Sequence, residues 1–423
     1  DRRKPNPDRK LIDEAVRVAE AAPVVLLCVG LDEIAESEGM DRSNMELSKG
    51  QRELIEAVCK VNRNVVLVLS GGSPFVIPGS FRAAIHGYLG GQAGAGAMAD
   101  ALLGKVNPSG KLNETWPLQL EDTPACAYFP SKERTAEYRE GLYIGYRYYD
   151  TANLPVRYPF GHGLSYTTFL YSDIRAEKDR VTFTIANVGA WDGAEVAQVY
   201  VSCKDGNVFR PQKELKGFAK VFLKAGESRT VSVSLDDKAF RYFNVKTNRW
   251  EVESGIYTIS VASDAAHVRL SANIRVESTN APAPYGALPG YESGRITRIS
   301  EVEYRDLLGH PIPDGHWGGE LTRNDAICQL YYAKTGAARL AYKILTRMKE
   351  KSEAKGIPDL NILFVYNMPF RALAKMSGGL MSDRMVDDVV FLVNGHFWRG
   401  LGRLIGDFFR NRRANKAFMR KIR

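Results

Sequence analysis

An acidic loop is the first feature of the sequence that could support chemistry. Within ten residues it holds five carboxylates, followed by an arginine: Asp32, Glu33, Glu36, Glu38, Asp41 and Arg42. Like charges this close together raise the pKa of some of the carboxyl groups, which is one route to a general acid. Acidic loops are more commonly solvated, or paired with a neighbouring arginine. The residues alone therefore leave the role of each carboxylate open.

The segments around this loop predict where it lies. Residues 24–29 and 65–70 are all-apolar runs, and helical patterns at 11–22, near 50–60 and at 95–103 alternate with them. Continuous β-branched runs separated by helices indicate a parallel sheet covered on both faces. The acidic loop follows the first of these strands, at the carboxyl edge where open α/β sheets place their ligands.

The rest of the chain divides by its periodicity. Residues 121–166 are rich in aromatic residues, Gly and Pro and are typical of an extended connector. Short strands with a period of two from 171 to 276 predict a β-sandwich of immunoglobulin or fibronectin type. The sequence thus predicts a multidomain chain, α/β plus all-β, with a helical extension. The expected parts are an α/β domain at 10–165, a sandwich at 170–276, a linker at 277–295 and the extension at 296–423.

Composition excludes several classes of protein. The 423 residues are 44% hydrophobic and 25% charged, as in ordinary globular proteins. No apolar run approaches the roughly 18–20 residues of a membrane span. The five cysteines are odd in number and form no CxxC pair, which argues against a disulfide framework and favours a reducing compartment. We therefore expect a cytoplasmic protein, although the chain begins with Asp1 rather than Met and secretion is left open.

No cofactor or metal is expected. The six histidines are scattered without the spacing of a metal site. Residues 94–99 imitate the start of a dinucleotide fingerprint, but they lie well past the first strand and no confirming acidic residue follows. Ser73 lacks the GxSxG context of a serine hydrolase. We interpret the small residues at 94–99 as a surface for close helix packing.

Nearly all of the net charge of +9 is at the C-terminal end. Residues 396–423 contain nine basic residues against one acid, Asp407, which is a net +8. A basic tail on a neutral body lacks the spread basic face of nucleic-acid-binding proteins, so no nucleic acid is expected. Apolar residues of the tail recur at helical spacing opposite the basic ones. This face fits contact with an anionic membrane, but packing on the protein's own body or on a second subunit is favoured.

A series of motifs in fixed order resembles glycoside hydrolase family 3. They are ESEGMDR at 36–42, GGQAG at 90–94, GKVNPSGKL at 104–112, YREG at 138–141, GYRYYD at 145–150, PFGHGLSY at 159–166 and KELKGF at 213–218. The resemblance covers about residues 10–276, as the second domain of that family and its terminal fibronectin-type domain. One departure is Asn113-Glu114, where many members have Pro.

The resemblance implies a retaining β-glycosidase, with hydrolysis of terminal non-reducing β-D-glucosyl residues as the expected activity. It places the proton donor, which later acts as a base, on Glu38, with Glu36 as the runner-up. Asp41 and Arg42 are expected to support the loop through an ion pair. Their substrate would be a β-linked oligosaccharide or glucoside.

Family members also carry a (β/α)₈ barrel that supplies the catalytic nucleophile, and nothing in this chain resembles it. About 120 residues after the sandwich are too few for a barrel of roughly 250. We therefore expect the C-terminal portion of a longer enzyme, inactive by itself, bacterial, active in carbohydrate metabolism and able to form a homo-oligomer. The alternatives are a non-catalytic carbohydrate-binding or scaffold protein, and a membrane-surface protein acting through its tail.

Overall fold

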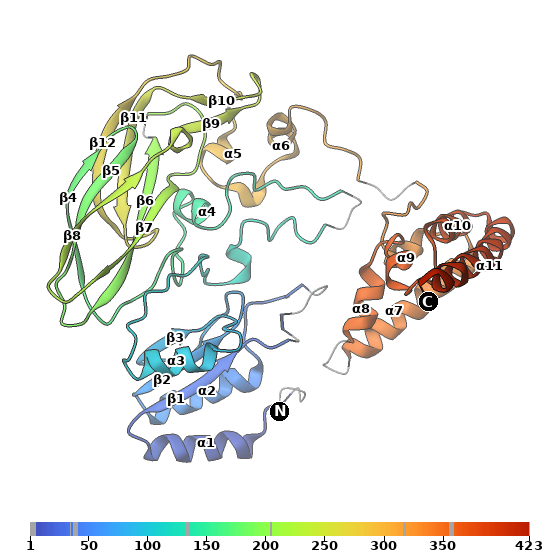
Figure 1. Ribbon diagram of the computed structural model, residues 1–423, viewed down its shortest axis with the longest axis horizontal. Coiled ribbons are helices and arrows are strands. Elements are labelled where there is room, and N and C mark those ends of the chain that lie inside the picture. The colour runs from blue at the N-terminus through green and yellow to red at the C-terminus, as the bar shows by residue number, and fades with distance from the viewer. Residues whose placement is uncertain are drawn as a thin grey trace.

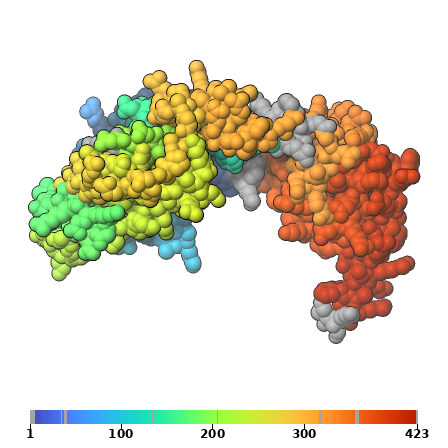
Figure 2. Space-filling model, turned by 90° about the horizontal axis from the view of Figure 1, so that it is seen from above, coloured from blue at the N-terminus to red at the C-terminus, as the bar shows by residue number. Residues whose placement is uncertain are grey.

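The computed structural model describes residues 6–33, 35–36, 41–131, 135–203, 205–315, 319–354 and 359–422. These residues form an α/β layer, a β-sandwich beside it and a helical lobe at the other end of the molecule (Figure 1). In the space-filling view the lobe forms one end of the elongated molecule (Figure 2). The predicted fold class, α/β followed by all-β and then helical, is confirmed.

The α/β layer holds a parallel sheet with strand order β1-β2-β3, in which Val25 pairs with Val65 and Val66 with Ala83. Helices α1 and α2 bury one face, where Ile55 and Leu67 are 0% exposed. On the other face of β1, Leu26 is 55% exposed, so coverage of both faces is not complete within the described residues. The elements are α1 (Arg9–Ala21), β1 (Val25–Gly30), α2 (Lys49–Val61), β2 (Val65–Ser70), β3 (Ala83–His86) and α3 (Gly94–Leu102).

The sandwich packs two antiparallel sheets, of order β4-β5-β8 and β12-β11-β6-β7, around one apolar core. Alternate residues of the central strands point into this core, such as Ala197, Val199 and Val201, as the period of two predicts. The strands are β4 (Phe169–Ala176), β5 (Arg180–Asn187), β6 (Gly193–Cys203), β7 (Glu214–Leu223), β8 (Ser228–Ser234), β11 (Gly255–Ala262) and β12 (Val268–Val276), with a hairpin of β9 (Arg241–Asn244) and β10 (Arg249–Val252) and the short helix η2 (Asp237–Ala239).

The segment predicted as a linker is packed. Within residues 277–295, Tyr291 is 0% exposed and its hydroxyl donates to the backbone oxygen of Arg139 at 2.9 Å. The Tyr143 hydroxyl donates to the backbone oxygen of Tyr291. An aromatic core therefore joins the connector to the chain that follows the sandwich. Its helices are η1 (Leu120–Asp122), α4 (Tyr146–Thr151), α5 (Pro289–Glu292), η3 (Ile296–Arg298) and α6 (Glu301–Leu308).

The helical lobe has a core of its own around Val386 and Phe370. A Cβ on Gly400 would lie 2.7 Å from the Leu392 Cβ, so this glycine permits the close approach of α11 to α10. No helix in the described ranges is long and apolar enough to cross a membrane. The lobe consists of η4 (Ile327–Tyr332), α7 (Gly336–Glu353), α8 (Leu360–Asn367), α9 (Ala372–Met376), α10 (Asp383–Val393) and α11 (Phe397–Ile422).

Candidate active site

The acidic loop starts from a fixed point at the carboxyl edge of the parallel sheet. The Gly30 N–H donates to Gln51 Oε1 at 2.9 Å, and Gln51 Nε2 donates back to the Gly30 oxygen at 2.9 Å. A Cβ on Gly30 would lie 2.0 Å from the Ser70 backbone oxygen, so only glycine fits at this end of β1. The backbone then turns, because the Glu36 N–H donates to the Asp32 oxygen at 2.9 Å.

Two side chains of the loop are tied to the turn that follows β2. The Glu36 carboxylate accepts from the Gly72 N–H at 2.7 Å and from the Ser73 hydroxyl. Arg42 Nη1 donates to Ser73 Oγ at 3.0 Å and to the Pro74 backbone oxygen at 2.9 Å. Ser73 therefore bridges Glu36 and Arg42, and both attachments lie on the same turn.

A second carboxyl group faces this cluster from another segment. Burial, and then the negative charge of Glu36, raise the pKa of Glu114. Burial lowers the pKa of Arg42, against the opposing effect of Glu36. Burial likewise lowers the pKa of His86, whose ring lies between Tyr88 and Trp116 with centroid distances of 4.2 and 5.3 Å. The site thus combines a carboxyl group that holds its proton more tightly than usual with a partly buried guanidinium.

A pocket of about 340 Å³ opens beside these groups. Its walls include Arg42, Ser73 and Glu114, with Tyr149 from α4. Arg42 Nη2 is buried and has no hydrogen-bond partner among the described residues. The wall of the pocket therefore carries a guanidinium and a carboxyl group, which are groups that bind the hydroxyl groups of polar ligands.

The predicted site residues have different positions in the structure. Glu38 lies outside the described residues, so its role stays a prediction. Glu36 is bound as described above, and Arg42 supports the loop. In the described part of the chain Arg42 bonds to Ser73 and Pro74 and Asp41 is exposed, so support of the loop by an ion pair of Asp41 and Arg42 stays a prediction.

Two residues of the site were missed by the sequence interpretation. Ser73 was considered only as a nucleophile, whereas it is the bridge of the loop. Glu114 stands at the position where the NPSGKL motif departs from the family pattern, and that departure is the signal that could have found it. Within the described ranges, no group of three or more His, Cys, Asp or Glu could hold a metal ion.

Residues 3–166 match the family model of the glycosyl hydrolase family 3 C-terminal domain, and residues 195–265 match a fibronectin type III-like domain. The chain carries the C-terminal region of glycoside hydrolase family 3. The family predicted from the motifs is therefore confirmed, and the sheet with its acidic loop falls inside the first match.

Known proteins of the family match this chain over part of their length. It is 38% identical over 402 residues to thermostable β-glucosidase B of Acetivibrio thermocellus, across 92% of this chain and 48% of the relative. It is 42% identical over 285 residues to an exo-α-(1→6)-L-arabinopyranosidase of Bifidobacterium breve, across 66% of this chain and 38% of the relative.

Among solved structures, a family 3 β-glucosidase of Bifidobacterium adolescentis superposes with a TM-score of 0.63 at 40% identity, across 72% of this chain and 45% of that one. The family 3 chain thus spans half or less of the length of these relatives. The match to the Acetivibrio protein covers so much of the chain that it extends beyond the fibronectin-type domain into residues 296–423.

Proposed function

We propose that this family 3 chain is the C-terminal part of a retaining β-glycosidase that hydrolyses terminal β-D-glucosyl residues. The support is its similarity to a β-glucosidase over 92% of the chain. Because the chain spans about half of that relative and contains no segment resembling a barrel, we assign the catalytic nucleophile to a barrel domain outside it. The chain's own contribution is the acidic loop.

In this proposal Glu38 is the proton donor. The observation that carries it is the attachment of Glu36 and Arg42, on either side of Glu38, to the turn at Ser73. Glu38 would protonate the oxygen of the leaving sugar while the barrel nucleophile attacks the anomeric carbon. In the second half-reaction the same carboxylate would take a proton from water, which then releases the sugar with retained configuration.

A second glycone is supported by a specific observation. The relative from Bifidobacterium breve has a higher identity, 42%, over a shorter stretch of 285 residues, and its name gives an exo-α-(1→6)-L-arabinopyranosidase. An α-L-arabinopyranoside is therefore the second candidate substrate. The same acidic loop would serve either sugar, since the proton goes to the leaving oxygen and not to the glycone.

The test starts from the reading frame that contains this chain. The complete enzyme, Glu38→Gln and Glu36→Gln are assayed on aryl β-D-glucosides and α-L-arabinopyranosides with leaving groups of different acidity. Glu38→Gln is expected to lose about 10²–10⁴-fold in kcat/KM on poor leaving groups. It should lose much less on dinitrophenyl glycosides, which need no protonation, and azide should restore part of the rate.

Glu36→Gln is the matched control, because it removes one negative charge from the same loop. If Glu36→Gln shows the loss that depends on the leaving group and Glu38→Gln does not, the proton donor is Glu36. If the frame encodes no barrel, the catalytic proposal falls and a non-catalytic carbohydrate-binding or scaffold protein takes its place. We further predict that the 423-residue chain alone does not turn over an aryl β-glucoside.

A further inference from the structure

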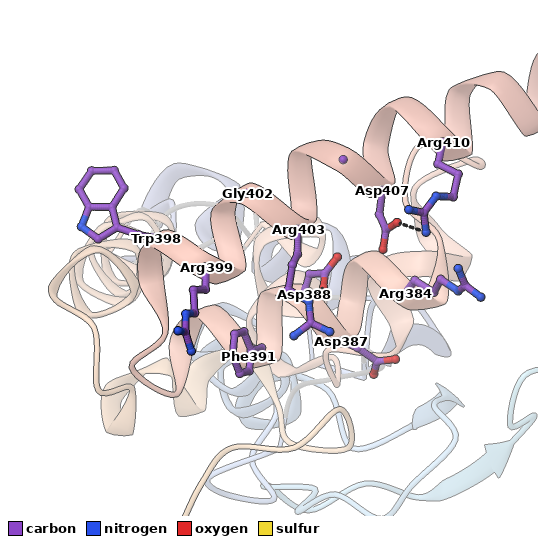
Figure 3. Close-up of a pocket in the computed structure, with 11 residues that line it drawn as sticks. Arg384, Asp387, Asp388, Phe391, Trp398, Arg399, Gly402, Arg403, Asp407 and Arg410 are labelled. Atoms are coloured by element: carbon purple, nitrogen blue, oxygen red, sulfur yellow. Dashed lines mark ion pairs between the residues drawn. The ribbon is translucent and has the colours of Figure 1, made fainter.

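A groove of about 900 Å³ runs between α10 and α11, far from the acidic loop in the sequence (Figure 3). Its sides carry arginine and aspartate residues from both helices, and Trp398 stands at one end with 80% of its surface exposed. The lining is Arg384, Asp387, Asp388, Phe391, Trp398, Arg399, Gly402, Arg403, Gly406, Asp407 and Arg410.

Two glycines leave this groove empty of side chains. Gly402 and Gly406 lie in the interior of the 26-residue helix α11, where glycine is less stable than alanine. A Cβ at either position would meet nothing within 4 Å, in contrast to Gly400, which α10 approaches closely. Internal packing therefore does not explain these two glycines, and their effect is to leave room over the helix backbone.

The charges along the groove are incompletely paired. Asp387 bonds to Arg323 at 2.9 Å, and Asp407 bonds to Arg410 at 2.7 Å. Arg384 and Arg399, in contrast, are exposed and form no ion pair or side-chain hydrogen bond within the described part of the chain. Two guanidinium groups on one groove remain available for an anion, and each can bind a carboxylate or phosphate through two donors.

Asp388 is the second and independent sign of a ligand. The residue is 3% exposed, and its Oδ1 lies 3.3 Å from Arg403 Nε. Its Oδ2 finds no N–H or hydroxyl donor in the described structure, and its polar neighbour is a second carboxyl group, Asp407. A buried acceptor without a donor is costly, so this oxygen favours a ligand that brings a hydroxyl group.

We propose that the groove binds a sugar that carries an anionic group, a carboxylate or a phosphate. The anion would bind Arg384 or Arg399, and a ring hydroxyl would donate to Asp388. A neutral sugar would leave the two arginines unpaired, and a simple anion would leave Asp388 without a donor. The bare backbone at Gly402 and Gly406 gives the ring its space. This site is independent of the acidic loop and of the activity proposed for it.

The test is isothermal titration calorimetry on the 423-residue chain. Glucuronate and glucose 6-phosphate are the two probes, and the tighter of them identifies the anionic group. Glucose and inorganic phosphate are the controls, each with half of the required chemistry. We expect either acidic sugar to bind at least about tenfold more tightly than both controls. Equal binding of glucose or of phosphate overturns the proposal, as does a failure of both acidic sugars to bind.

Variants locate the binding. The double variant Arg384→Gln/Arg399→Gln should weaken it at least about tenfold. Arg412→Gln/Arg420→Gln removes the same charge from α11 outside the groove lining and should leave the affinity unchanged. Gly406→Leu fills the groove while favouring the helix, so it should abolish binding without lowering the melting temperature. Unchanged affinity in Gly406→Leu, or equal losses in the two double variants, would show that the ligand binds elsewhere.

Discussion

Asp264 in the sandwich and Asp388 in the helical lobe are buried to nearly the same extent, 5% and 3% exposed, yet their pKa values move in opposite directions. Burial by itself would raise the pKa of Asp264, but hydrogen bonds from His162 and His267 hold it at about 2. Burial raises the pKa of Asp388, and the neighbouring Asp407 raises it further.

The difference comes from the donors around each carboxyl group. Asp264 lies in the turn between β11 and β12, where the N–H groups of Ala266 and His267 donate to its Oδ1 at 3.0 and 2.9 Å. His267 Nδ1 lies 2.7 Å from the same oxygen. Asp388 has one arginine and faces a second carboxyl group. Equal burial therefore gives a satisfied structural anion in one region and an incompletely satisfied one in the other.

The largest effect is expected from Asp264→Ala. The substitution leaves the N–H groups of Ala266 and His267 without their charged acceptor in a partly buried turn, so we expect a loss of about 2 kcal/mol in the free energy of unfolding of the sandwich. Because the folded pKa is lowered, this stabilisation is present above the ordinary pKa of 3.8 and is lost as the pH falls toward about 2. Urea unfolding at a series of pH values, followed by tryptophan fluorescence, measures the loss in the free energy of unfolding and its dependence on pH. Asp237→Ala, at an exposed position, is the control, and an equal loss there would refute the argument.

A smaller effect of opposite sign is expected from Asp388→Asn. Since the folded pKa of Asp388 is raised, its ionisation destabilises the lobe as the pH rises above the ordinary value of 3.8 and through the raised pKa. The amide cannot ionise, so the variant should lose this pH dependence and melt no lower than the wild type at neutral pH. Thermal unfolding at a series of pH values tests it. A variant that keeps the wild-type pH dependence would exclude Asp388 as its source.

The smallest effect extends the comparison to the acidic loop. Glu36→Gln removes the negative charge beside Glu114, so the pKa of Glu114 should fall toward its ordinary value, with burial still holding it above that value. Carbon-13 NMR titration of the glutamate carboxyl groups measures this change. Glu46→Gln, on an exposed residue that pairs with Arg52 at 2.9 Å, is the control and should leave Glu114 unchanged.

Strands with clear periodicity were predictable, and shorter or distant features were not. The run at 65–70 coincides with β2, because its β-branched residues fill a central strand. The hairpin of β9 and β10 was missed, since four residues per strand give too short a pattern. Residues 277–295 have the composition of a linker, yet Tyr291 is buried there. Its partner Tyr143 is far away in the sequence, so the contact could not be predicted.

In the candidate site, too, local features were predictable and contacts between distant segments were not. The acidic loop and its place at the sheet edge followed from the sequence, because residue type and the strand that directly precedes the loop are local features. The bridge through Ser73 could not be predicted, since it depends on how the turn after β2 meets Arg42 in space. The low pKa of Asp264 could not be predicted either, because it depends on a contact in space with His162 of the connector.

The hydrogen bond from the Tyr143 hydroxyl to the Tyr291 backbone oxygen bears on where this protein can be cut into folded fragments. A fragment ending at Val276 would keep every strand of the sandwich but would uncover Tyr143, which is 0% exposed in the intact chain. A fragment ending beyond Ile312 would retain that whole core. The smallest unit expected to fold cleanly therefore extends past the fibronectin-type domain, and the helical lobe begins only where that unit ends.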